Sequence, residues 1–208
     1  MVPTEPVGRD VELSKLYHAL MNPLTVVLGY AQLLSARKDL DEEVREQVSR
    51  ILDEARECSR IVERARSSSP RARSSAAASG SGGGGTARRR VLVVDDEPVI
   101  QKLTAEALGP GCDVVGVSST VEAAQLLLSE DFDVVMLDLS LSGEISGRAL
   151  YETLLVQQSD VAERVVFVTG GSRDPDEAEF VTNSGRESLR KPFHLRTLRE
   201  VVDRVGEV

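Results

Sequence analysis

The chain has 208 residues, of which 41% are hydrophobic and 3% aromatic, and its formal net charge is −9. A chain of this length forms one domain or two small ones, with a core built from aliphatic side chains. The acidic balance excludes a protein whose whole surface binds nucleic acid, because neutralising phosphates needs basic side chains. We therefore expect no nucleic-acid partner.

The N-terminal region carries no signal for export or membrane insertion. Residues 1–10 lack the basic and then apolar order of a signal peptide. The most apolar stretch, residues 24–34, is shorter than the roughly 18 residues that a membrane span needs. Cys58 and Cys112 fit neither a disulfide framework nor a zinc motif. These features predict a soluble, cytoplasmic protein with no membrane partner.

Composition divides the chain into three parts. Residues 64–90 hold seven Arg and no acidic residue, whereas residues 91–208 hold 10 basic and 22 acidic residues. Residues 67–87 are mostly Ser, Ala, Gly and Arg and cannot bury a core. They predict a flexible linker between a domain at residues 10–66 and a second domain at residues 88–208.

The first domain has the period of two amphipathic helices. Apolar residues recur at spacings of three and four in two series. The first series is Leu13, Leu16, Leu20, Leu24, Val27, Leu28, Ala31 and Leu34, and the second is Val44, Val48, Ile51, Leu52, Ala55, Val62 and Ala65. Between them, Asp39 and Glu42 have the spacing of a capping box that opens the second helix. Because two helices bury too little for a stable unit, we expect a homodimer whose two hairpins form a four-helix bundle.

The second domain alternates short Val-rich strands with amphipathic helices. The expected strands are residues 91–94, 114–117, 132–137 and 165–168, and the expected helices are residues 98–108, 120–129, 147–157 and about 195–205. A further helix is expected to start at Asp174 and Pro175, and Ser119 with Glu122 predicts a capped helix start. This order predicts a doubly wound, five-stranded parallel sheet of the flavodoxin type, whose sites lie at the carboxyl ends of the strands.

Charged residues gather where the strands end. The first strand runs into Asp95 and Asp96, the third ends at Asp138, and Lys191 follows the fifth. Carboxylates that converge without a cation would repel each other, so they indicate a hard divalent ion, of which Mg²⁺ is the natural choice. A carboxylate beside Mg²⁺, with an ammonium group nearby, can accept a phosphoryl group. The alternative is an acidic rim that is merely solvated.

The segments VLVVDDE, LDLSLSG, VTGG and RKPF, in this order, resemble the receiver domain of the response-regulator family over residues 88–208. The resemblance implies that Asp138 is the phosphoacceptor and that the bond between Lys191 and Pro192 is cis. The ligands that it implies are Asp95, Asp96, Asp138 and the backbone carbonyl of Ser140 for Mg²⁺, and Thr169 and Lys191 for the phosphoryl oxygens.

Three positions depart from the family's pattern. Leu141 and Ser142 stand where the family usually has Met-Pro, and Ser188 stands where it usually has Tyr or Phe. That aromatic residue is the rotamer switch by which many receivers signal. The resemblance therefore implies a receiver that passes its phosphate onward more than it reads it out.

The string HALMNPLTVVLGYAQLL, which begins at His18, resembles the H-box of the histidine-kinase dimerisation and phosphoacceptor domain. The resemblance implies that His18 is phosphorylated, that Pro23 bends the helix and that Asn22 orients a water for dephosphorylating a receiver. For Asn22 the alternative is a polar surface residue without a role. Ala19 stands where the family has an acidic general base. Helical spacing groups His18 with Ser14, Asn22, Thr25 and Gly29 opposite the Leu series, and we therefore expect the ring of His18 to be exposed.

Two hypotheses follow for the function. In the first, His18 and Asp138 exchange a phosphoryl group in a two-component phosphorelay, with the phosphate supplied by a separate histidine kinase or response regulator. In the second, the chain is a non-catalytic dimeric binding module or a phosphate sink that regulates a separate histidine kinase, with the receiver as the only phosphorylated site. The two domains leave no length for an ATP-binding domain, so we do not expect autokinase activity from this chain alone.

Overall fold

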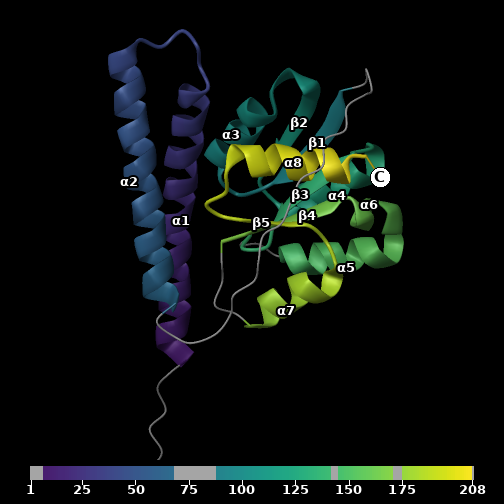
Figure 1. The fold of residues 1–208 in the computed structure, drawn as a ribbon. Coiled ribbons are helices and arrows are strands. Elements are labelled where there is room, and N and C mark those ends of the chain that lie inside the picture. Colours follow the sequence, from purple (N-terminus) through teal and green to yellow (C-terminus); the bar gives the residue numbers. More distant parts are fainter. Residues whose placement is uncertain (1–6, 68–87, 142–144, 171–174, 208) are drawn as a thin grey trace, which may run out of the picture.

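The structure is a computed structural model that describes residues 7–67, 88–141, 145–170 and 175–207 (Figure 1). A helical hairpin stands beside an α/β domain. The elements in chain order are α1 (Val7–Ser35), α2 (Glu42–Ser67), β1 (Arg89–Val94), α3 (Pro98–Leu108), the 3₁₀-helix η1 (Gly109–Gly111), β2 (Cys112–Val117), α4 (Thr120–Ser129), β3 (Val134–Asp138), α5 (Gly147–Gln157), α6 (Ser159–Glu163), β4 (Val165–Thr169), α7 (Pro175–Ser184), β5 (Ser188–Arg190) and α8 (Leu195–Val205).

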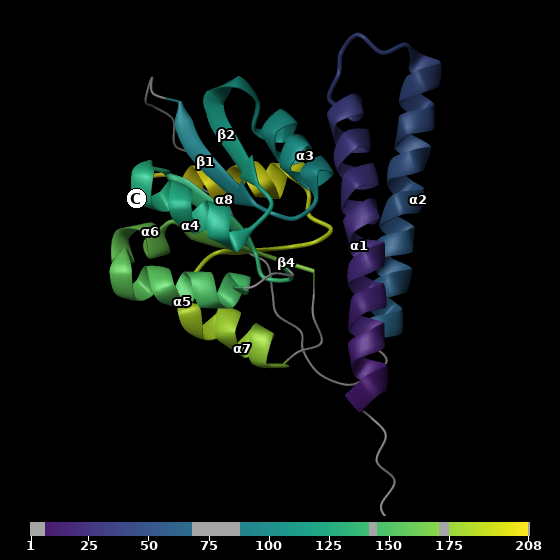
Figure 2. The same ribbon diagram turned by 180° about the vertical axis from the view of Figure 1, so that it is seen from behind.

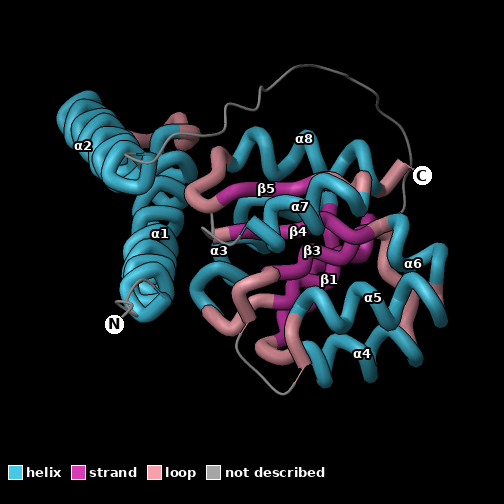
Figure 3. Tube along the Cα trace, turned by 90° about the horizontal axis from the view of Figure 1, so that it is seen from below, coloured by secondary structure: helices cyan, strands magenta, loops and turns pink. Residues whose placement is uncertain are grey.

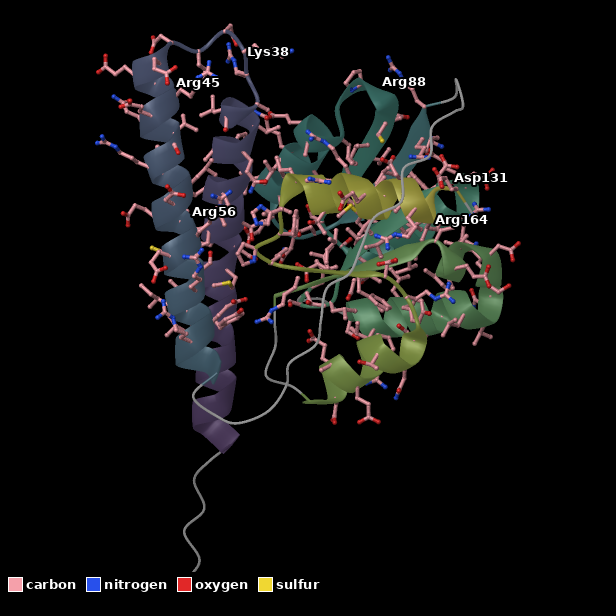
Figure 4. All side chains as sticks on the ribbon, viewed as in Figure 1. Lys38, Arg45, Arg56, Arg88, Asp131 and Arg164 are labelled. Carbon is pink, nitrogen blue, oxygen red and sulfur yellow. The ribbon has the colours of Figure 1, made fainter. Side chains whose placement is uncertain are left out.

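The helices α1 and α2 lie side by side, which confirms the predicted hairpin. Lys38 and Arg45 lie near the tip, where the two helices are joined (Figure 4). The core between the helices is small, because five buried side chains form it among those that the structure describes. These are Leu28, Ala31, Val48, Leu52 and Ala55.

The start of α2 differs from the prediction. The helix begins at Glu42, and the Val44 N–H donates to the Asp41 carboxylate with 2.9 Å between N and Oδ1. Asp39 instead forms an exposed ion pair of 2.5 Å with Arg37. The predicted Asp39 capping box is therefore wrong. Asp41 directly precedes the helix, and from that position a carboxylate reaches the free N–H groups of the first turn.

The five strands of the sheet are parallel throughout and have the order β2-β1-β3-β4-β5. This arrangement confirms the doubly wound fold. The buried Val-rich runs of β1 and β3 pair at the centre of the sheet, which is why neither run alternates with polar residues. The third strand spans Val134–Asp138 rather than residues 132–137, and the Asp133 carboxylate accepts from the Arg90 N–H just before it.

Helices cover both faces of the sheet (Figure 3). On one face, α3 and α8 pack over a core cluster that includes Leu103 and Val202. On the other face, α4, α5 and α6 pack over a second cluster, in which the rings of Tyr151 and Phe167 meet edge to face at 4.9 Å between centroids. The α/β domain therefore has a complete core of its own.

The helix α1 lies between α2 and the α/β domain (Figure 2). Asn22 and Thr25 are only 4% and 1% exposed, and Gly29 is buried against Leu103 of α3. The side of α1 opposite the Leu series is therefore covered by the α/β domain at these three residues, so the alternative of a polar surface residue is wrong for Asn22. The side chains of Ser14 and His18 lie outside the described part of the structure.

The residues of the Leu series of α1 lie in two different environments, one buried and one exposed. Leu28 and Ala31 pack against α2. Four other members of the series remain exposed, namely Leu16, Leu20, Val27 and Leu34. On α2, Ile51 and Ile61 are exposed as well. The hairpin thus presents apolar residues that neither helix nor the α/β domain covers.

Some predictions fall on residues that the structure does not describe, namely the linker at 67–87 apart from Ser67, the Ser142 position and the Asp174 cap. The start of α7 at Pro175 agrees with the prediction. So does the start of α4, where the Ser119 hydroxyl accepts from the Glu122 N–H. Both cysteines are free thiols. No helix within the described ranges combines the length and the apolar composition needed to cross a membrane.

Candidate functional site

A buried lysine joins two carboxylates at the carboxyl edge of the sheet. Asp95 directly follows β1, Asp138 ends β3 and Lys191 directly follows β5. Lys191 Nζ donates to Oδ2 of Asp95 and to Oδ2 of Asp138, at 2.7 Å in each case. All three residues are buried. The parallel strands thus bring together three of the site residues that the sequence selected.

Burial dominates the electrostatics of this site. It raises the pKa of Asp95 to about 6, a rise that Lys191 opposes and the Asp138 carboxylate strengthens. For Lys191, burial alone would lower the pKa, but attraction to the Asp138 and Asp95 carboxylates outweighs it, and the pKa is raised. Lys191 is therefore an ammonium ion at neutral pH, and its charge allows two carboxylates to lie together away from water.

The other site residues selected from the sequence surround these three. Asp96 is exposed, and Thr169 is half-buried at the end of β4, where its carbonyl accepts from the Lys191 N–H at 2.8 Å. The Ser140 N–H donates to Asp138 Oδ1 at 2.8 Å. The bond between Lys191 and Pro192 is cis, as the family resemblance implies.

Among the described residues, no three His, Cys, Asp or Glu side chains are grouped so that they could hold a metal ion. Asp95 and Asp138 share Lys191 instead. Their donor atoms are nonetheless carboxylate oxygens, and two carboxylates against one ammonium leave a negative charge in the site, to which the exposed Asp96 lies adjacent. This set of donors fits a hard divalent cation such as Mg²⁺.

The hairpin reaches this site through α1. His18 is a residue of this helix, and Asn22 lies one turn after it. Asn22 donates from Nδ2 to the Glu97 carboxylate. The Glu97 N–H in turn donates to Asp95 Oδ1 at 2.9 Å. Two consecutive hydrogen bonds therefore connect the helix that carries His18 to the buried carboxylates.

Sequence reasoning missed residues that shape the site. A Cβ on Gly147 would lie 2.6 Å from the carbonyl oxygen of Asp138, so only glycine lets α5 begin this close to the end of β3. The Ser146-Gly147 pair is a helix-start signal that could have drawn attention to it, and Ser146 does cap α5. Gln101 donates from Nε2 to the Asp95 carbonyl at 2.7 Å. No local pattern marks Gln101, because the contact depends on the packing of α3 beside β1.

The structure describes two of the three departures from the family's pattern, Leu141 and Ser188. Ser188 is exposed in β5, where it pairs with Phe167 of β4. Leu141 is buried in the core cluster that includes Tyr151. At position 188, the edge strand β5 therefore exposes a small hydroxyl side chain instead of an aromatic ring.

Two family models match the chain. The response regulator receiver domain matches residues 91–203, and the His Kinase A (phospho-acceptor) domain matches residues 9–70. Because the first match covers more than half of the chain, the chain belongs to the response-regulator receiver family. The two domains together place the protein in two-component phosphorelay signalling and do not favour the alternative of a non-catalytic binding module. Receiver domains generally bind Mg²⁺ at the phosphorylation site.

Solved structures of receiver domains share the fold of the α/β domain. A CheY-like receiver domain protein from Methanospirillum hungatei JF-1 is 24% identical with a TM-score of 0.52, and the match covers 58% of this chain and 95% of that one. A receiver domain of a putative Luxo repressor protein from Vibrio parahaemolyticus is 25% identical with a TM-score of 0.51, covering 58% and 92%. A sensor protein from Polaromonas sp. JS666 is 25% identical with a TM-score of 0.51, covering 58% and 98%. A comparison with curated proteins finds none that matches.

Proposed function

We propose that this protein carries phosphoryl groups in a phosphorelay, bound to His18 and to Asp138 in turn. The observation that supports the proposal best is the Lys191 ammonium held 2.7 Å from both Asp95 and Asp138. A fixed positive charge beside a carboxylate suits it to accept a phosphoryl group, whose oxygens need neutralisation. The family match over residues 9–70 supports the histidine side of the exchange.

In the transfer step, an oxygen of the Asp138 carboxylate forms a bond to phosphorus as the phosphorus–nitrogen bond of phosphorylated His18 breaks. The ring nitrogen keeps the electron pair, and the ring leaves as a neutral imidazole if its other nitrogen is protonated. Lys191 offsets the charge of the phosphoryl oxygens, and the Thr169 hydroxyl donates to one of them. Mg²⁺, with Asp95, Asp96, Asp138 and the backbone carbonyl of Ser140 as its ligands, supplies further charge neutralisation when bound. The same groups serve the reverse transfer.

Asn22 is assigned the role of orienting a water that removes the phosphoryl group. Its support is the hydrogen bond from Nδ2 to Glu97, next to the acidic site. Because water attack and transfer would use the same phosphorylated Asp138, loss of this role would lengthen the lifetime of phosphate on the receiver.

A separate histidine kinase or response regulator is the proposed source of phosphate. The cytoplasm is the proposed compartment, which suits the two free thiols. The proposed division of the chain is a domain at residues 10–66, a flexible linker at 67–87 and the receiver at 88–208. Two chains are proposed to associate through the exposed apolar residues of the hairpin. The exposed Leu16, Leu20 and Val27 support this association.

The test uses the full chain, Mg²⁺ and a radiolabelled small phosphodonor such as acetyl phosphate. Wild type is expected to take up label in two forms, an alkali-labile acyl phosphate and an alkali-stable, acid-labile phosphohistidine. Asp138→Asn should lose both forms, and His18→Gln should lose only the alkali-stable one. Alkali-stable label that is absent from wild type, or equal in His18→Gln, would overturn the proposal.

A further inference from the structure

The first contact between the hairpin and the receiver is a close helix approach at Gly29. A Cβ there would lie 2.4 Å from Cδ2 and 2.7 Å from Cδ1 of Leu103 in α3. Glycine inside a helix lowers the stability of that helix. The neighbouring Tyr30 and Leu33 pack against the receiver's core cluster. Gly29, which lowers the stability of α1, thus lies where any side chain would overlap Leu103 of α3.

The second contact is a helix cap that one domain supplies to the other. The first N–H groups of a helix have no partners within it. At the start of α8, the N-cap residue His194 makes no side-chain cap hydrogen bond. The Leu195 N–H instead donates to Oε1 of Gln32 in α1, at 2.9 Å. A hairpin side chain therefore completes a helix of the receiver.

The third contact involves Arg190, the residue before the buried Lys191. Arg190 Nη2 donates to the Tyr17 hydroxyl of α1 at 3.2 Å and lies 3.5 Å from Oε1 of Glu63 in α2. One receiver side chain thus spans both helices of the hairpin. Together with the Asn22 to Glu97 hydrogen bond, these contacts touch two of the three chain segments that carry the acidic site, the one after β1 and the one around β5.

We infer that the α1 face formed by Asn22, Gly29, Gln32 and Leu33 is a docking surface that reversibly binds the receiver of the same chain. We call this docked state the clasp. Weak binding follows from the chemistry of the contacts. The pair of Arg190 and Glu63 is about half exposed, and such pairs add little stability. Gln32 Nε2 is buried with no hydrogen-bond partner among the described atoms, which opposes docking.

Because the two domains belong to one chain, a weak interface is sufficient for them to dock. Residues 68–87 join the two domains, and a linker of this length holds them at an effective concentration on the order of millimolar. The clasp therefore closes within one chain at protein concentrations where separate domains would not associate. Combined with the proposed phosphorelay function, it also means that a separate receiver reaches this face of α1 only when the chain's own receiver leaves it.

Carbodiimide coupling in the full-length protein tests the clasp. Arg190→Lys introduces an amine beside the Glu63 carboxylate, and the reagent joins the two as an amide that peptide mass spectrometry identifies. Adding Gly29→Gln should lower the coupling at least about fivefold and increase the radius of gyration in X-ray scattering, because the larger side chain has no room against Leu103. Gln is a better helix former than Gly, so unchanged or higher helicity by circular dichroism separates undocking from unfolding.

Two controls complete the experiment. Leu128 of α4 is 75% exposed, and Leu128→Gln should leave the coupling of the Arg190→Lys protein unchanged. Mixing ¹⁵N-labelled with unlabelled chains before coupling should give products in which both peptides carry the same isotope. Absent coupling, coupling that persists with Gly29→Gln, or products that join one labelled and one unlabelled peptide would each overturn the clasp. These readouts involve no phosphate, so they are independent of the proposed phosphorelay function.

Discussion

The hairpin and the receiver differ in how far each buries its own apolar surface. Among the residues that the structure describes, the receiver sheet lies between two core clusters of fifteen buried residues each, whereas the hairpin core has five. The hairpin leaves Leu16, Leu20, Val27 and Leu34 exposed on one side of α1 and lays another side on the receiver. The receiver thus encloses its own core, whereas the hairpin leaves apolar side chains of both its helices uncovered.

The difference in burial also matches what the aspartate site and the proposed histidine site each require. A buried Lys191 between two buried carboxylates needs a rigid, dry surrounding, and the two clusters on either side of the sheet provide it. In the proposed function, a phosphorylated His18 must instead meet different partners, which suits a helix on a small unit with exposed apolar residues. The comparison predicts that substitutions in the receiver act mainly on its own stability, whereas substitutions in the hairpin act on association.

The largest expected effect comes from removing the buried ammonium group. Lys191→Met leaves two buried carboxylates without their partner, and we expect the free energy of unfolding of the receiver to fall by about 3–5 kcal/mol in urea titrations without Mg²⁺. Added Mg²⁺ should recover part of the loss, because a divalent cation also neutralises the carboxylates. As a control, Lys102→Met breaks an exposed pair with Glu106 and should change stability by about 0.5 kcal/mol or less. Equal effects of the two substitutions would contradict the assigned role of Lys191.

Association should respond to the hairpin instead. Val27 is 44% exposed on α1. Val27→Glu places a charge in the proposed bundle, and we expect the dissociation constant of the dimer to rise at least about tenfold, since burying one such side chain contributes about 1.5–3 kcal/mol. Sedimentation equilibrium of the full chain measures it. Leu128→Glu makes the same kind of change on the receiver and should leave the mass unchanged. A wild-type chain that is monomeric at micromolar concentration would exclude the proposed dimer.

The parts of the fold that local patterns determine could be predicted from the sequence. The Val-rich run of β1 could be predicted from its short, almost entirely apolar composition, and the meeting of the carboxylates after it from the rule that parallel strands end at one edge. The fifth strand and α6 are too short for such a pattern, with three and five residues. Their positions depend on tertiary pairing with β4 and α5.

The face of α1 around Asn22 shows why the rest could not be predicted. Its polar and small residues have the pattern of a solvent-facing surface, and spacing alone cannot reveal that a second domain covers them. Gly29 carried a signal, because a glycine inside an amphipathic helix lowers its stability without local benefit. Gln32 carried none, since its role as a cap depends on where α8 begins.

The smallest expected effect concerns the turn that closes the hairpin. Asp41 accepts from the Val44 N–H at 2.9 Å, and Asp41→Ala should lower the stability of the hairpin by about 1 kcal/mol, the usual cost of losing a helix N-cap. Asp39 lies two residues earlier with its carboxylate paired to Arg37 in solvent, so Asp39→Ala should cost a few tenths of a kcal/mol at about the level of exposed ion pairs. Thermal unfolding followed by circular dichroism at 222 nm compares the two variants. Because the receiver has a complete core, both losses should appear only in the part of the helical signal that the hairpin contributes. If Asp39→Ala proved the more harmful, the cap would lie where the capping-box spacing placed it, and the hairpin turn would differ from the one described.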